Sequence, residues 1–207
     1  ISLLNKTLLA HPSLLVANLI YAINYTFAKD VMPIYIEPSG FILLRVIGAL
    51  SLFAIAYFVF VKEKVERKDL FRLAICGVFG VAINQLLFFE GLNLTTPINA
   101  AIIMTSNPIL VMIMSFLIIK EKITFRKGLG ILLGIIGASA LILNRGDISL
   151  DTNMQLGNLF VLINATSYGL YLVIVKPMMV KYHPITVMFF VFSFGLFYVI
   201  PFGFSNL

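Results

Sequence analysis

Residues 38–61 read PSGFILLRVIGALSLFAIAYFVFV, an apolar run that contains a single charged side chain, that of Arg45. A helix that crosses the hydrocarbon core of a bilayer, about 30 Å thick, needs about 20 mostly apolar residues, so this run predicts a transmembrane helix. Other runs of the same kind are separated by charges and by Pro, Gly or Asn clusters. The predicted spans are residues 12–28, 38–61, 70–92, 97–119, 127–143, 155–175 and 184–204.

The composition agrees with an all-α polytopic membrane protein. The chain is 60% hydrophobic and 12% charged, whereas soluble domains are about 25% charged. Its net charge of +6 does not indicate a nucleic-acid partner, because the basic residues sit in short clusters between the apolar runs. The single cysteine, Cys76, excludes both an intrachain disulfide and a cysteine-based zinc site.

The distribution of Lys and Arg predicts the orientation. Of the 15 basic residues, only Lys29 and Arg145 fall on one side of the predicted spans, Arg45 lies within a span, and the others lie on the opposite side. Cytoplasmic connections carry the excess of positive charge. We therefore expect an integral protein of the bacterial inner (cell) membrane with a cytoplasmic amino terminus.

A weak internal repeat relates the first predicted span to the sixth. The matching pairs are Tyr21 and Tyr168, Lys29 and Lys176, and Pro38 and Pro184. Five spans separate the two copies, and an odd repeat unit reverses its orientation in the membrane. The pattern thus predicts inverted repeats, an arrangement that supports alternating access around a site at the bilayer midplane.

Residues 91–108, GLNLTTPINAAIIMTSNP, are followed by the rest of the fourth span, by KEK at 120–122 and by a glycine-rich fifth span. Together with Lys29, Pro38 and Arg45, this order of motifs resembles the EamA-like transporters of the drug/metabolite transporter superfamily. The resemblance covers the whole chain and implies ten helices in a five-plus-five inverted repeat. Residues 1–145 would form the first repeat and 146–207 the start of a second, so we expect three further spans beyond this chain.

The resemblance also implies a function. It indicates a secondary transporter that exports small metabolites such as amino acids or related organic compounds. A passive channel or a non-transporting scaffold stays open as the alternative. We expect no enzymatic activity, metal or cofactor: the sequence has no zinc motif of the His-Glu-x-x-His type, no Gly-x-Ser-x-Gly nucleophile motif and no phosphate-binding loop.

Two ionisable residues within the predicted spans need an explanation, because burying a charge in a bilayer costs at least about 2.5–3.5 kcal/mol. Arg45 lies about two turns from the outer end of its span, and Glu90 lies near the outer end of span three. We predict a charge pair or a shared hydrogen-bond network, with Arg45 as a possible anchor for a substrate carboxylate or phosphate. Locking of helices by Arg45 is the alternative.

Polar and aromatic residues recur at helical spacing near the middle of spans one and six. If these residues faced lipid, their hydrogen-bonding groups would be unsatisfied, so we expect the residues to face the protein interior. They predict a central substrate pocket, although packing between helices explains them as well. Including residues of spans three and four, the candidates are Asn18, Tyr21, Tyr25, Asn84, Gln85, Asn107, Asn164, Ser167, Tyr168 and Tyr171.

Two further features concern the helices themselves. Pro108 lacks the backbone N–H of an ordinary helix residue, so we expect a bend near it and a freed carbonyl. Gly130, Gly134 and Gly137 form a small-residue face on span five. That face predicts close helix packing, as scaffold or in a homodimer.

Overall fold

The computed structural model describes residues 3–122, 124–143 and 152–204, and the ordered elements of these residues are all helical, which confirms the all-α prediction. The predicted boundary between the repeats at 145/146, together with Arg145, lies outside the described residues. The helices are α1 (Leu3–Val31), α2 (Pro38–Ala56), α3 (Arg67–Gly77), α4 (Ile83–Leu94), α5 (Pro97–Met104), α6 (Asn107–Ile119), α7 (Phe125–Leu143), α8 (Thr152–Lys181) and α9 (Pro184–Gly203), with π-helical segments η1 (Tyr57–Val61) and η2 (Val78–Ala82).

Several of these elements join into segments that could cross a membrane. Within the described residues, 5 helical segments are long and apolar enough: Pro38–Val61, Arg67–Leu94, Pro97–Ile119, Thr152–Lys181 and Pro184–Gly203. The predicted spans at 12–28 and 127–143 coincide with the helices α1 and α7. The segments support a polytopic integral membrane protein, as predicted.

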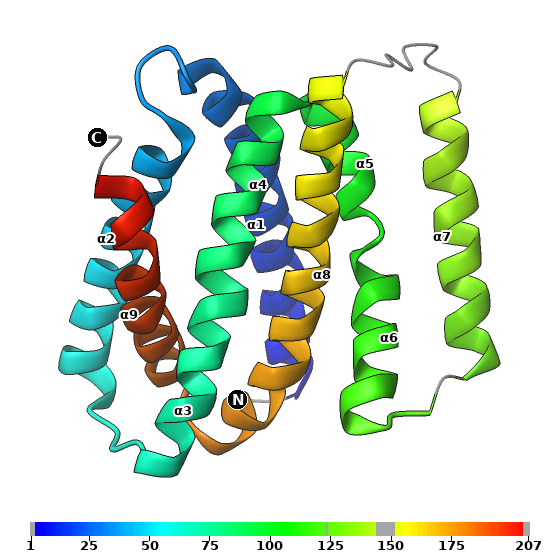
Figure 1. Cartoon of the computed structure of the whole chain (residues 1–207). Coiled ribbons are helices and arrows are strands. Elements are labelled where there is room, and N and C mark those ends of the chain that lie inside the picture. The colour runs from blue at the N-terminus through cyan, green and yellow to red at the C-terminus, as the bar shows by residue number, and fades with distance from the viewer. Residues whose placement is uncertain (1–2, 123, 144–151, 205–207) are drawn as a thin grey trace.

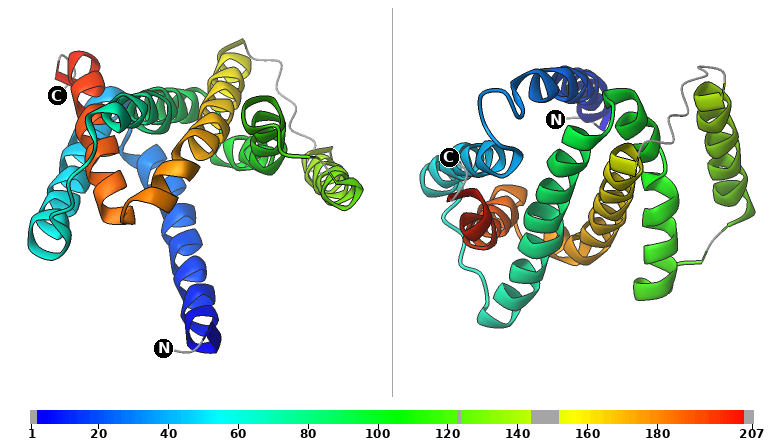
Figure 2. Two further views of the ribbon diagram at one scale, coloured as in Figure 1. Left: turned by 90° about the horizontal axis from the view of Figure 1, so that it is seen from below. Right: turned by 45° about the horizontal axis from the view of Figure 1, so that its top comes forward.

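Helix α8 is the central element of the fold (Figure 1). It packs against α4, α5, α6 and α3, while α2 packs against α9 on the other side of the α3–α4 span. Two helices lie at the periphery. The amino-terminal part of α1 extends away from the other helices, and α7 stands apart beyond α6 (Figure 2).

Prolines and lysines mark the helix boundaries. Pro38, Pro97 and Pro184 occupy first turns, where a missing N–H costs nothing. At the opposite ends, Lys62 and Lys120 have left-handed backbone conformations, with φ of 46° and 53°, which end the helix before each.

The span at residues 97–119 is broken in its middle. Between α5 and α6 lie Thr105 and Ser106, whose hydroxyls donate to the carbonyls of Ile102 and Ile103 at 2.6 and 2.7 Å. These side-chain bonds occupy carbonyls near the break, where Pro108 cannot donate to the preceding turn. The bend expected near Pro108 is therefore present, as a discontinuous helix.

Helices α4 and α8 cross at a pair of glycines, Gly91 of α4 and Gly157 of α8. A Cβ built on Gly91 would lie 2.8 Å from the carbonyl oxygen of Gly157, and one on Gly157 would lie 2.8 Å from that of Gly91. Close to this crossing, the Thr95 hydroxyl donates to Asn158 Oδ1 at 2.6 Å. Small residues let two membrane helices approach closely, so this crossing fixes α4 against α8.

The glycine face predicted on span five is arranged differently. A Cβ built on Gly130, Gly134 or Gly137 would meet nothing within 4 Å, so within the described part of the chain α7 does not use these glycines for close packing. Close helix packing through this face, as scaffold, stays a prediction. Dimerisation through this face stays a prediction.

The two lysines of the sequence repeat make different contacts. Lys29 donates to the carbonyls of Leu92 and Asn93, at 2.9 and 2.5 Å, in the last turn of α4. Carbonyls at a helix carboxyl end lack intrahelical partners and favour a cation. Lys176 instead forms an ion pair with Glu121, at 3.5 Å. Lys29 therefore holds the end of α1 against the end of α4.

Candidate functional site

A cavity of about 300 Å³ lies between four of the apolar segments and α1, and most of the predicted pocket residues line it. Asn107 and Asn164 fall near the middle of their segments, in agreement with a site inside the membrane. The lining residues are Asn18, Asn24, Tyr25, Arg45, Asn84, Gln85, Phe88, Phe89, Met104, Asn107, Asn164 and Tyr168.

Arg45 is the one residue of this lining that carries a full charge at neutral pH. Its Nη1 donates to Asn24 Oδ1 at 3.0 Å, which joins α2 to α1. Its Cζ lies 4.7 Å from the centroid of the Phe89 ring and 5.8 Å from that of Phe41. Cation–π contacts of this kind contribute about 0.5–2 kcal/mol. Together the amide and the rings fix the plane of the guanidinium beside the cavity.

Aromatic rings form a second part of the wall. Tyr25 of α1 meets Phe88 of α4 edge to face, with ring centroids 5.1 Å apart. Phe88 and Phe89 follow Gln85 by one helical turn, so they share its face of α4. Tyr168 of α8 completes this part of the lining. A ligand would therefore meet apolar ring faces beside the charged end of Arg45.

Amide side chains form the third part. Asn164 is 1% exposed, and its Nδ2 donates to the backbone carbonyl of Asn84, joining α8 to α4. Among the described residues, the buried side-chain polar atoms without a hydrogen-bond partner are Gln85 Oε1, Asn107 Oδ1, Asn164 Oδ1 and Thr186 Oγ1. All but Thr186 belong to the cavity lining. Unpaired acceptors are thus concentrated at one place in the molecule.

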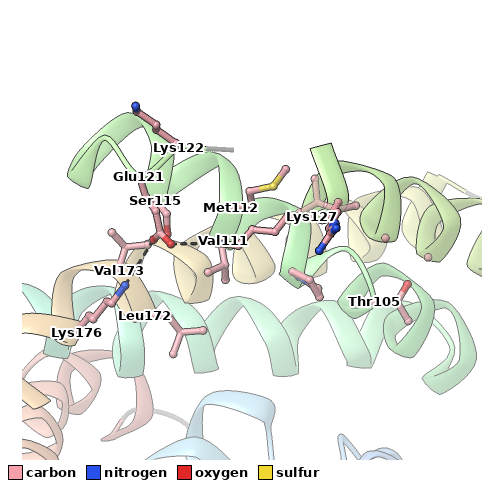
Figure 3. Close-up of a pocket in the computed structure, with 15 residues that line it drawn as sticks. Thr105, Val111, Met112, Ser115, Glu121, Lys122, Lys127, Leu172, Val173 and Lys176 are labelled. Carbon is pink, nitrogen blue, oxygen red and sulfur yellow. Dashed lines mark hydrogen bonds and ion pairs between the residues drawn. The ribbon is translucent and has the colours of Figure 1, made fainter. Parts of the chain in front are cut away.

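A second and larger cavity, of about 590 Å³, lies between α6, α7 and α8 (Figure 3). At its charged end, Glu121 pairs with Lys127 at 3.1 Å and with Lys176 at 3.5 Å. The side chains between these charges and Thr105 are mainly aliphatic, such as Val111 and Leu172. The charged groups of the larger cavity lie near the ends of helices, whereas the polar groups that line the smaller cavity come from within the apolar segments. We therefore take the smaller cavity as the candidate site.

The family model for EamA-like transporters matches residues 8–143. The chain belongs to the EamA-like transporter family. The match confirms the resemblance seen in the sequence motifs, including residues 91–108.

Similar proteins are designated uncharacterized transporters. The chain is 29% identical over 141 residues to the uncharacterized transporter YyaM of Bacillus subtilis (strain 168), an alignment that covers 66% of this chain and 46% of the relative. It is 32% identical over 117 residues to an uncharacterized transporter of Methanothermobacter thermautotrophicus, covering 56% of this chain and 34% of that one. The chain thus spans about half the length, or less, of these relatives. No solved structure matches it significantly.

The structure of this EamA-like chain shows which of the predicted substrate residues line the cavity. Eight of the predicted substrate residues line the cavity. Ser167 donates instead to the carbonyl of Phe79 at 2.7 Å, and the Tyr171 hydroxyl lies 3.7 Å from Met188 Sδ. The Tyr21 side chain lies outside the described residues. Glu90 does not line the cavity, so its predicted pairing with Arg45 stays a prediction.

The sequence-based prediction missed several lining residues. Asn24, Phe88, Phe89 and Met104 are not among the predicted candidates. The spacing from Gln85 to Phe88 and Phe89, at i+3 and i+4, was the available signal. Apolar residues within an apolar span give no contrast, so this spacing alone does not distinguish them from the other residues of the span.

Proposed function

We propose that this EamA-like chain is part of a secondary transporter that exports small metabolites such as amino acids. We propose further that the cavity around Arg45 is the substrate site. The observation that carries the proposal is the gathering of amide, aromatic and guanidinium side chains from α1, α2, α4, α6 and α8 at one cavity. Polar groups inside a membrane protein usually mark the path of a solute. The transporter designation of the relatives agrees with this reading and suggests a non-enzyme.

Arg45 is the proposed anchor for a substrate carboxylate. A guanidinium presents a planar set of N–H donors that matches a carboxylate in two parallel hydrogen bonds. Contact with Asn24 and Phe89 holds this plane in place before a ligand arrives. A preoriented donor loses less freedom on binding, which favours affinity.

The proposed transport cycle is alternating access between two five-helix inverted repeats, of which this chain holds the first and the beginning of the second. Side chains of both meet at the cavity, for example Asn84 and Asn164. The break between α5 and α6 lies in the cavity wall, between Met104 and Asn107. Half-helices that meet at a break can change their mutual angle, and discontinuous helices line the sites of many transporters.

Counterflow in liposomes tests the proposal. The full-length protein would be loaded with one unlabelled amino acid at a time, and uptake of the labelled compound would be followed for wild type, Arg45→Ala and the control Arg67→Ala. We expect saturable counterflow for wild type and control, and its loss in Arg45→Ala with unchanged folding by circular dichroism. Flux without counterflow would indicate a passive channel. Absence of flux for every amino acid would favour a scaffold.

A further inference from the structure

The unpaired amide oxygens indicate more about the substrate than Arg45 does alone. Gln85 Oε1, Asn107 Oδ1 and Asn164 Oδ1 come from α4, α6 and α8 and belong to one lining. A buried acceptor without a donor costs about 1–3 kcal/mol. A cost repeated in three neighbouring side chains is explained if a ligand supplies the donors.

The amide nitrogens of two of these residues are already engaged by the protein. Asn164 Nδ2 donates to the carbonyl of Asn84, and Asn107 Nδ2 lies 3.9 Å from Met104 Sδ. Each amide therefore directs its donor to the protein and leaves its oxygen unused. The terminal torsion of an amide is soft, so a small rotation presents the oxygen to a ligand in the cavity.

Charge limits which donors can bind there. Arg45 gives the lining a formal charge of one positive unit, so a ligand that is only cationic would be repelled. A ligand that is only a carboxylate would leave the three oxygens unpaired. A primary ammonium carries three N–H donors, and in a zwitterion it accompanies a carboxylate that neutralises Arg45.

We propose that Gln85, Asn107 and Asn164 form an ammonium subsite in the cavity that Arg45 also lines, and that this subsite selects zwitterions with a primary ammonium group over deaminated and N-methylated analogues. This inference rests on the proposed function. It adds the residues that determine specificity and the chemical group that they recognise. A quaternary ammonium has no N–H donor, so it cannot satisfy the amide oxygens.

Binding to the purified full-length protein in detergent tests the proposal. The probes are L-alanine and L-phenylalanine, each beside its deaminated acid (propionate and 3-phenylpropionate) and its N-trimethyl derivative. For each amino acid that binds, we expect at least about tenfold weaker binding of both analogues, because hydrogen bonds to a charged group are among the strong ones. Equal affinity of the amino acid and its deaminated acid would overturn the subsite while leaving the carboxylate anchor intact.

Two variants assign the effect to the amides. Gln85→Met and Asn107→Leu keep the approximate shape and remove the unpaired oxygen, so the fold should persist. We expect at least about tenfold weaker binding of the amino acid and unchanged binding of the deaminated acid. Thr186→Val is the matched control, since Thr186 Oγ1 is also buried and unpaired but lies outside the cavity.

The remaining outcomes are also decisive. Unchanged amino-acid affinity in both amide variants would show that the unpaired oxygens are only a feature of packing, and would overturn the subsite. Stabilisation by NaCl without any amino acid, lost in Asn107→Leu, would assign the oxygens to a sodium ion instead. Failure of every probe to bind wild type, together with absence of counterflow, would overturn the proposed function as well.

Discussion

The hydroxyl of Tyr182, in the connection between α8 and α9, donates a 2.7 Å hydrogen bond to Asp69 Oδ2 in the first turn of α3. The same hydroxyl accepts from the backbone N–H of Glu66 at 3.1 Å. Lys181 adds ion pairs to Asp69 at 2.6 Å and to Glu66 at 2.5 Å. One tyrosine thus joins the connection between α8 and α9 to the beginning of α3.

Tyr182→Phe should therefore destabilise the protein. Tyr182 is buried. Removal of its hydroxyl takes one hydrogen-bond partner from the Asp69 carboxylate and one from the backbone N–H of Glu66, at a cost of about 1–3 kcal/mol. The measurement is the thermal unfolding midpoint in detergent. Tyr35→Phe is the control, because Tyr35 is 82% exposed. Equal midpoints for the two variants would show that the Tyr182 hydroxyl contributes nothing to stability.

The glycine crossing of α4 and α8 gives a second prediction. Gly91→Ala places a methyl group 2.8 Å from the carbonyl oxygen of Gly157, so the helices must separate, and overpacking of this kind costs about 1–3 kcal/mol. We expect a lower unfolding midpoint. Gly48→Ala, where a Cβ meets nothing within 4 Å, should keep or slightly raise the midpoint. Similar midpoints for both variants would contradict a tight crossing.

Arg45→Lys separates charge from geometry at the proposed anchor. Lysine keeps the positive charge but loses the planar pair of donors and the stacking on Phe89. We expect the KM for counterflow of an amino acid to rise by about tenfold, the size of one lost strong hydrogen bond. Full transport with an unchanged KM would exclude two-point carboxylate binding by Arg45 as an essential step.

The ion pairs of Glu121 predict a dependence on pH. The hydrogen bond from Lys127, with the nearby charge of Lys176, holds the pKa of Glu121 below its ordinary value. The contribution of Glu121 to stability is therefore present above its unfolded pKa, about 4.3, and is lost as the pH falls through the lower folded pKa. Unfolding midpoints of wild type and Glu121→Gln should differ at neutral pH and converge in acid.

Asp30→Asn, at an exposed carboxylate far along the chain, serves as the control for general acid effects. A difference between wild type and Glu121→Gln that stayed constant as the pH fell from neutral through the acid range would contradict the role of the carboxylate charge, because protonation removes that charge.

The sequence was sufficient to place most helices, because the residues that begin and end a helix lie next to it in the chain. Pro38 and Pro97 begin helices, and charged residues follow Val61 and Ile119, so the segments at 38–61 and 97–119 agree with the structure. The sixth span was predicted to end at Val175, whereas α8 continues to Lys181. Lys176 and Pro177 suggested an end there, but the helix accommodates both. Local signals of this kind do not report what tertiary packing tolerates.

The pocket residues were predictable to the extent that polar side chains within apolar spans must face the protein. That rule places Asn84, Asn107 and Asn164 at the cavity. It also places Ser167 and Tyr171 inside the protein, but there they contact the α3–α4 span and α9 and not the cavity. A helix surrounded on several sides has more than one inward face, and only the packing of its neighbours decides which face meets the cavity.

The central position of α8 has a consequence for the order of synthesis. Helices α1 to α7 are synthesised before residue 152, so α4 and α6 are made before their main packing partner. Until α8 arrives, Asn84 and Gln85 have to be shielded from lipid by the insertion machinery or by neighbouring helices. Assembly of the cavity is therefore a late event in the biogenesis of this protein, and substitutions in α8 should act first on the yield of inserted protein.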